Sequence, residues 1–294
     1  MTFLFDMIKG IFIGIANVIP GVSGGTMAVS LGIYDKLIGA ISNLLKDWKK
    51  SASVLLPILL GCGIGIIGFT YAIEYLLSNH TYVTCMAFVG LILGGIPILL
   101  RSMGETMRSQ KASIGISGIA MFLILFVVCV GLPFLNSGEE VLKTLEATPG
   151  TMITLFFIGV IASATMVIPG VSGSMVMMIL GYYYGIIDTI KNFVESLRMF
   201  DMAGLVHGFS LLFPFGIGVL LGIFLIAKLI TFLFEQYGVQ TYCGILGLIA
   251  ASPFAIFYNT GLYLQLGTLS WFTIILGLAI AVVCGAITYV VGEK

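Results

Sequence analysis

The chain has 294 residues, of which 59% are hydrophobic and 9% are charged, whereas about 25% of the residues of an ordinary soluble domain are charged. This composition excludes a water-soluble globule, and apolar runs of about twenty residues, long enough to span the ~30 Å hydrocarbon core, predict an all-α polytopic membrane protein. The 13 basic and 13 acidic residues balance, and no block of like charge is long enough for nucleic acid, which is excluded as a partner.

An internal repeat divides the chain into two halves, and it constrains the architecture more firmly than hydropathy does. The segment Val18–Gly24 recurs without change as Val167–Gly173, at an offset of 149 residues. Further along, after an insertion of about eight residues, the offset becomes 157. Other matched positions are Leu31-Gly32 with Leu180-Gly181, Tyr34 with Tyr183, Pro57 with Pro214, and Gly61 and Gly65 with Gly218 and Gly222.

The first half, residues 1–135, begins with an apolar piece over about residues 3–17. As a helix this piece extends only ~22 Å, which is short of the hydrocarbon core. The Pro-Gly-Val-Ser-Gly segment that follows ends the helix, because proline removes a backbone donor and glycine permits non-helical conformations. With a second piece over about 25–45, it predicts a re-entrant hairpin at about 3–45. Three spans are predicted next, at about 52–78, 82–100 and 113–135.

The second half, residues 151–294, follows an external connector over 136–150 and repeats the plan. It predicts a re-entrant hairpin at about 151–194 and spans at about 209–235, 240–258 and 269–291. Because each half has three crossings and a hairpin that leaves on the side it entered, the second half is inserted upside down. The predicted fold is therefore two inverted-topology repeats with six spans, or up to ten if the hairpins cross.

Basic residues of the short loops predict the orientation. Two basic loops are separated by two crossings and so face the cytoplasm together, which also places both termini inside. The acidic connector then lies outside. The residues concerned are Lys46, Lys49 and Lys50, then Arg101, Arg108 and Lys111, and in the connector Glu139, Glu140 and Glu146.

The N-terminal stretch and the cysteines add two further expectations. Asp6 and Lys9 interrupt the first apolar piece, and no cleavage site follows, so it does not read as a removable signal peptide and we expect the mature chain to start at Met1. The cysteines are odd in number, lie in apolar runs and lack metal-ligand spacing. His80 and His207 also lack metal-ligand spacing. Disulfides, a metal site and any cofactor are not expected. The cysteines are Cys62, Cys85, Cys129, Cys243 and Cys284.

The two Pro-Gly-Val-Ser-Gly segments are the predicted substrate site, because interrupted helices at matching places in inverted halves point to a site near the bilayer midplane. Backbone N–H groups and hydroxyls there can converge on a phosphate or carboxylate, and glycines let the backbone approach it. The alternative is that the glycines allow tight helix packing and the serines cap helices. The candidate binding residues are Asn17, Pro20, Gly21, Ser23, Gly24, Gly25, Thr26, Pro169, Gly170, Ser172, Gly173 and Ser174.

Ionisable residues inside predicted spans are further candidate functional residues, because a charged side chain inside the membrane costs free energy. Lys228 can supply a mobile countercharge for an anion that crosses the membrane, and Glu74 can titrate as a coupling group. Both lie toward the ends of their helices, where the alternative for Lys228 is to extend to the headgroups. Asp35 with Lys36, and Asp188 with Lys191, are expected to be interfacial charges.

The absence of catalytic and nucleotide motifs argues against an enzyme. The sequence has no Gly-x-x-x-x-Gly-Lys-Ser/Thr loop, His-Glu-x-x-His or Gly-x-Ser-x-Gly motif, which excludes ATP-driven transport within this chain. Ser23 and Ser172 have no histidine motif to activate them. An intramembrane lipid-phosphate hydrolase is therefore only a distant alternative.

The segment Ala16–Thr26 with Leu31-Gly32-Ile33-Tyr34, its echo Val167–Gly173, and Gly90-Leu91-Ile92 resembles the PopT polyprenyl-phosphate transporter family over essentially the whole chain. The resemblance implies a multi-pass protein of a prokaryotic cytoplasmic membrane that translocates undecaprenyl phosphate, the lipid carrier of cell-wall and glycan precursors. The runner-up is a secondary transporter of a small soluble anion that uses the same sites. The oligomeric state stays open.

The second copy of the motif departs from the first. Ser174-Met175 replaces Gly25-Thr26, and Thr165-Met166 replaces Ala16-Asn17. The two copies are therefore not expected to have equal roles.

Overall fold

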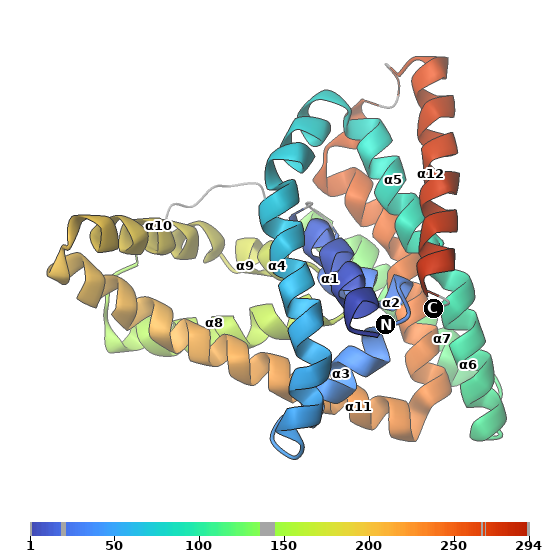
Figure 1. Ribbon diagram of the computed structural model, residues 1–294, viewed down its shortest axis with the longest axis horizontal. Coiled ribbons are helices and arrows are strands. Elements are labelled where there is room, and N and C mark those ends of the chain that lie inside the picture. The colour runs from blue at the N-terminus through green and yellow to red at the C-terminus, as the bar shows by residue number, and fades with distance from the viewer. Residues whose placement is uncertain (1, 19–21, 136–144, 266, 268, 293–294) are drawn as a thin grey trace. The chain divides into compact units, whose positions relative to one another are not determined.

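The structure is a computed structural model that describes residues 2–18, 22–135, 145–265, 267 and 269–292. Throughout this part of the chain the regular elements are helices (Figure 1), as the hydropathy pattern predicted. The α-helices are α1 Thr2–Val18, α2 Gly24–Ser30, α3 Tyr34–Ser42, α4 Trp48–Asn79, α5 Thr81–Leu93, α6 Ile96–Ser109, α7 Ile116–Gly131, α8 Pro149–Val167, α9 Gly173–Ile179, α10 Tyr183–Met199, α11 Met202–Asn259 and α12 Trp271–Gly292. Two short 3₁₀ turns are η1 Leu132–Leu135 and η2 Leu262–Leu264.

Within the described residues, six helical segments are long and apolar enough to cross a membrane. The chain is therefore a polytopic all-α membrane protein. Two of the predicted spans, 209–235 and 240–258, lie in α11, where the backbone leaves helical geometry at Tyr237 (φ −133°, ψ 42°). The six segments are Trp48–Phe69, Thr81–Ser109, Ile116–Phe134, Pro149–Val167, Met202–Asn259 and Trp271–Gly292.

The predicted hairpins differ from the structure in their second pieces. The first pieces correspond to α1 and α8, but each second piece, predicted as one helix, is divided in two. Gly32 (φ 67°) separates α2 from α3, and Gly181 (φ 76°) separates α9 from α10. These left-handed conformations favour glycine and end a right-handed helix. In the second copy, α9 and α10 meet at 109°.

The chain forms two compact units that do not follow the two halves of the sequence. Unit 1 contains Met1–Pro133, Ile168–Val171 and Ala227–Lys294, and unit 2 contains Phe134–Val167 and Ser172–Ile226. Each unit thus holds part of the second PGVSG element, which we define as Pro169–Gly173. The first PGVSG element, Pro20–Gly24, belongs to unit 1. The predicted inversion of the sequence halves stays a prediction.

In unit 1, glycines let α1 approach α4 closely (Figure 1). A Cβ atom on Gly10 would collide with the Ile58 carbonyl oxygen, and one on Gly61 would collide with the Met7 carbonyl oxygen. In the same way, a Cβ atom on Gly90 of α5 would collide with the backbone of α12 at Ala281. Helices in a membrane gain no hydrophobic free energy by associating, because lipid tails are as apolar as the side chains. Close van der Waals packing drives their association instead, and small residues such as glycine allow it.

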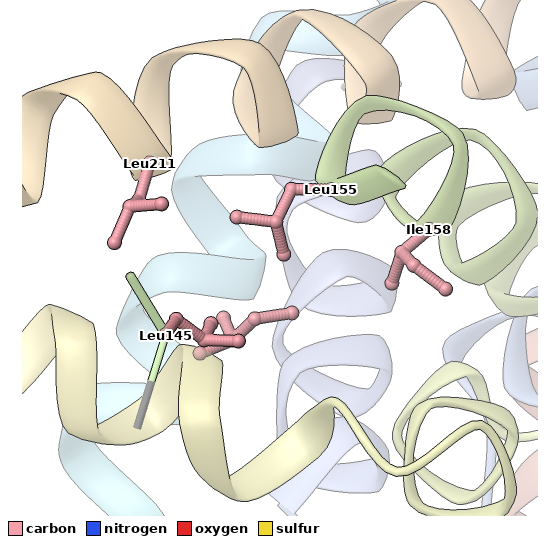
Figure 2. Packing of buried hydrophobic residues seen from close by; sticks show 5 residues of the cluster. Leu145, Leu155, Ile158 and Leu211 are labelled. Carbon is pink, nitrogen blue, oxygen red and sulfur yellow. The ribbon is translucent and has the colours of Figure 1, made fainter. Parts of the chain in front are cut away.

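In unit 2, α8 packs on the first part of α11 through backbone contacts at Gly159 and Gly218. Beside these glycines lies a cluster of buried apolar side chains, four of which Figure 2 labels. It joins the residues before α8 to α8, α10 and α11. Its members are Leu145, Leu155, Ile158, Ile186 and Leu211.

The helix contacts inside the two units correspond to one another through the sequence repeat. The offset of 149 aligns α1 with α8, and the offset of 157 aligns α4 with the first part of α11. Close backbone contacts recur at the aligned positions, so the glycines of the repeat have the same packing role in both units. The matched pairs are Gly10–Ile58 with Gly159–Phe215, and Gly61–Met7 with Gly218–Phe156.

Candidate substrate-binding site

The first PGVSG element leads into α2, whose first turn is held by side-chain oxygens. Ser23 is the N-cap residue, and its Oγ accepts a hydrogen bond from the Thr26 N–H at 3.1 Å. Asn17, near the end of α1, accepts the Gly24 N–H on its Oδ1 at 3.1 Å. Ser23 and Thr26 are only 4% and 1% exposed. These buried amides therefore find neutral side-chain acceptors, as helix starts require.

Thr26 also connects the first PGVSG element to the second. Its Oγ1 accepts the Gly170 N–H at 2.6 Å, across 144 residues of sequence, and lies 3.1 Å from the Ser23 Oγ. Pro169 and Gly170 are both buried in unit 1. The structure thus brings Thr26 together with one of the predicted residues of the other half.

Only glycine fits at position 170. Its φ of 80° lies in the left-handed region, and a Cβ atom would meet the Leu248 carbonyl oxygen and the Cys129 Sγ. The Cys129 thiol donates to the Gly170 carbonyl oxygen at 3.1 Å. Cys129 is the small buried residue that its sequence context predicted, and it also bonds the backbone of the candidate site.

The rest of the second PGVSG element lies in unit 2, at the start of α9. The Ser172 and Ser174 hydroxyl oxygens are 2.8 Å apart, with Ser172 half-buried and Ser174 exposed. Gly173 lies against the Ala162 carbonyl oxygen. Met166 occupies the position that Asn17 has in the first copy, and a thioether cannot replace the amide oxygen that accepts the Gly24 N–H. The two copies therefore differ in hydrogen bonding.

The remaining predicted residues have varied surroundings. Gly25 is buried in α2, and Lys228 is exposed on α11. Glu74 belongs to α4, but its side chain lies outside the described residues, as do Pro20 and Gly21. The connector carboxylates Glu139 and Glu140 also lie outside. Among the residues that are described, no group of three His, Cys, Asp or Glu side chains is placed to hold a metal ion.

Sequence reasoning missed a set of charged residues in unit 1. Asp6 and Lys9 are buried on α1, and the Lys36 ammonium forms an ion pair with the Asp6 carboxylate. Asp35 accepts a hydrogen bond from the Tyr242 hydroxyl at 2.9 Å. Asp35 and Lys36, expected as interfacial charges, thus hold α3 to α11 and α1. A signal for Asp6 and Lys9 exists, because their helical spacing places them on the face of Ile13 and Ala16.

This chain matches known proteins over nearly its whole length. Residues 13–265 match the VCA0040-like family, described as undecaprenyl phosphate translocase-like, and this stretch includes both PGVSG elements. The chain belongs to this family. The match confirms the resemblance drawn from Ala16–Thr26 and its echo.

Two curated relatives of this translocase-like chain are each named polyprenyl-phosphate transporter. One, from Staphylococcus aureus (strain NCTC 8325 / PS 47), is 29% identical over 285 residues, which are 96% of each chain. The other, from Vibrio cholerae serotype O1 (strain ATCC 39315 / El Tor Inaba N16961), is 30% identical over 222 residues, 71% of this chain and 67% of the relative. The relatives are named as transporters, not as enzymes. No solved structure matches the chain.

Proposed function

We propose that the protein translocates a polyprenyl phosphate, such as undecaprenyl phosphate, across the cytoplasmic membrane and so returns the lipid carrier for cell-wall and glycan synthesis. Membership of the translocase-like family and the names of both relatives support this substrate. The structural observation that carries the proposal is the buried bond between Thr26 and Gly170. It joins the first PGVSG element to the part of the second that belongs to the same unit, and transporters built from inverted repeats bind substrate at such interrupted segments.

The chemistry of this junction suits an anionic headgroup. The N–H groups of Gly24, Thr26 and Gly170 are donors whose acceptors are neutral side-chain oxygens. A phosphate oxygen is a stronger acceptor than a hydroxyl or an amide oxygen, and it can replace one of them without leaving a buried N–H unpaired. The isoprenoid tail stays in the lipid, which requires a lateral opening. Lys228 is proposed as the mobile countercharge and Glu74 as a coupling group.

The proposed topology follows the loop charges. Both termini and the loop that contains Lys46, Lys49 and Lys50 face the cytoplasm, and the connector over 136–150 faces outside. With an inverted repeat, the two PGVSG elements enter the membrane from opposite sides. A headgroup can then reach the same midplane site from either leaflet.

Purified protein in liposomes that contain labelled polyprenyl phosphate tests the function. We expect the wild type to move the label between leaflets, and Ser23→Ala and Ser172→Ala each to weaken binding of the lipid phosphate, by about 1–3 kcal/mol where the hydroxyl donates to the charged group. A small-anion carrier would move no lipid, and a hydrolase would release inorganic phosphate. Unchanged affinity in both alanine variants would favour the packing role of these segments.

A further inference from the structure

The buried face of α1 carries two charged residues. Asp6, Lys9, Ile13 and Ala16 recur at helical spacing, and all four are buried, with Asp6 8% and Lys9 5% exposed. The same face ends at Asn17, which accepts the Gly24 N–H in the candidate site. With a rise of 1.5 Å per residue, Lys9 lies about 12 Å along the helix from Asn17. A buried ammonium group therefore lies on the helix that leads to the first PGVSG element.

The charges around Lys9 do not balance. The Asp6 carboxylate attracts Lys9 but is already paired with the Lys36 ammonium, which repels Lys9. Two ammonium groups thus share one carboxylate. Among the described residues, the Lys9 ammonium itself forms no hydrogen bond or ion pair. Because a buried charge costs several kcal/mol unless it is fully compensated, the excess positive charge favours an anionic ligand.

A cavity reaches Lys36, one member of this group of charges. It has a volume of about 480 Å³ and lies between α3 and the start of α4, lined in part by Lys36, Asn43, Lys46 and Lys50. Its carboxylates are engaged, since Asp35 accepts from Tyr242 and Asp47 accepts the Lys50 N–H. The volume is typical of ligand sites. Lys36 therefore lies between a cation-lined cavity and the buried pair of Asp6 and Lys9.

We propose that Lys9 is a phosphate-binding residue, and that the phosphate group of a prenyl phosphate lipid passes through this cavity, pairs with Lys36 in place of Asp6 and binds Lys9. The proposal rests on the proposed function, since it names a second headgroup site in the same transporter. The arriving phosphate supplies the negative charge that the group of Asp6, Lys9 and Lys36 lacks. Lys9 then binds the headgroup between this cavity and the junction of Thr26 and Gly170.

Substitutions at position 9 separate this role from a structural one. Lys9→Met removes the excess charge and leaves the Asp6–Lys36 pair intact, so the protein should unfold at the same or a higher temperature. Lys9→Gln keeps a hydrogen-bond donor toward Asp6. If Lys9 served only to neutralise Asp6, Lys9→Met would instead lower the unfolding temperature. Lys49→Gln is the matched control, because Lys49 lies on the Trp48 ring outside the cavity.

The test measures binding of geranylgeranyl phosphate and, separately, of inorganic phosphate by calorimetry in detergent. We expect Lys9→Met and Lys9→Gln to weaken binding of the prenyl phosphate about ten- to a hundredfold, which corresponds to about 1.4–2.8 kcal/mol, and Lys49→Gln to bind like the wild type. Wild-type affinity in either Lys9 variant would overturn the proposal. Lys9-dependent binding of inorganic phosphate alone, without the prenyl phosphate, would overturn the lipid assignment.

Transport in liposomes separates failure of this inference from failure of the proposed function. Wild-type protein that moves no polyprenyl phosphate would contradict the function. Active wild type together with full transport by Lys9→Gln would contradict only the role of Lys9. Active wild type with transport by Lys9→Gln reduced at least about tenfold, against unchanged Lys49→Gln, would support it.

Discussion

At the scale of single residues, Thr26 connects more of the candidate site than any other predicted side chain that the structure describes. Its own N–H donates a hydrogen bond to the Ser23 Oγ, and its hydroxyl oxygen accepts one from the Gly170 N–H. All three groups are buried, so none can exchange its partner for water. An unpaired amide in such a place costs more than an ordinary hydrogen bond contributes. The Thr26 hydroxyl is therefore expected to matter for stability as well as for substrate binding.

Thr26→Val tests this directly. The substitution keeps the shape of the side chain but removes the acceptor, so the Gly170 N–H is left buried and unpaired. We expect a loss of about 1–3 kcal/mol in the free energy of unfolding, measured by denaturation in detergent. Thr26→Ser is the control, because it keeps the hydroxyl and should lose much less. Equal stability of the Val and Ser variants would contradict the proposed importance of the hydrogen bond.

Lys228 gives a second prediction at this scale. Its side chain is exposed on α11, from where a long flexible ammonium can meet a phosphate headgroup. Lys228→Gln should abolish transport in liposomes without unfolding the protein, and Lys228→Arg should keep part of the activity, because charge is retained while geometry changes. Near-normal transport by the Gln variant would show that Lys228 only extends to the headgroups.

At the scale of helices, the repeat is recognisable as a pattern of close glycine contacts. Gly61 on α4 lies against the Met7 carbonyl oxygen, and Gly218 on α11 lies against that of Phe156. The same helices carry Gly63 and Gly216, around which an added Cβ would meet nothing within 4 Å. Each helix therefore contains a packed glycine and an unpacked one two residues apart. They form a matched comparison in each unit.

We expect Gly61→Ala and Gly218→Ala each to destabilise the protein by about 1–3 kcal/mol, since the methyl group forces the backbones apart. Gly63→Ala and Gly216→Ala should be neutral or stabilising by up to about 1 kcal/mol, because alanine is the better helix former. Thermal unfolding of the four variants in one detergent measures this. If all four behaved alike, helix propensity rather than close packing would explain the glycines.

At the scale of the whole molecule, the proposed function depends on how the chain crosses the membrane. Six segments of the described chain are long enough to span it, and the loop charges predict the side on which each end lies. Inversion of the two halves requires an odd number of crossings in each. A measurement of the membrane topology therefore tests whether the two halves of the chain act from opposite leaflets.

Reporter fusions test this topology in a bacterial host. Green fluorescent protein after Lys294 should fluoresce, because the C-terminus is predicted to be cytoplasmic, while alkaline phosphatase at the same place should be inactive. Alkaline phosphatase inserted in the connector over 136–150 should be active. Active phosphatase both in the connector and at the C-terminus would mean an even number of crossings in the second half, and the inverted repeat would be lost.

Sequence alone was enough to predict the membrane class, the all-helical fold and the family. A membrane-spanning helix is recognisable from about twenty consecutive apolar residues, and proline and glycine interrupt helices through their own local geometry. Because these effects are local, the helix breaks in both copies could be located from the sequence, and the repeat showed that they occupy matching positions. The second pieces were predicted as single helices because a left-handed glycine such as Gly32 has no local signal that distinguishes it from a packing glycine.

Only the tertiary structure decided which polar groups meet. The Thr26–Gly170 bond spans 144 residues, the Tyr242–Asp35 bond spans 207, and the Lys36–Asp6 pair spans 30. A hydroxyl or carboxylate finds its partner by position in space, and neither periodicity nor composition records that position. Asp6 and Lys9 illustrate this limit. In the sequence they share a helical face with Ile13 and Ala16, but only helix packing shows that Lys36 pairs with Asp6 and lies near Lys9.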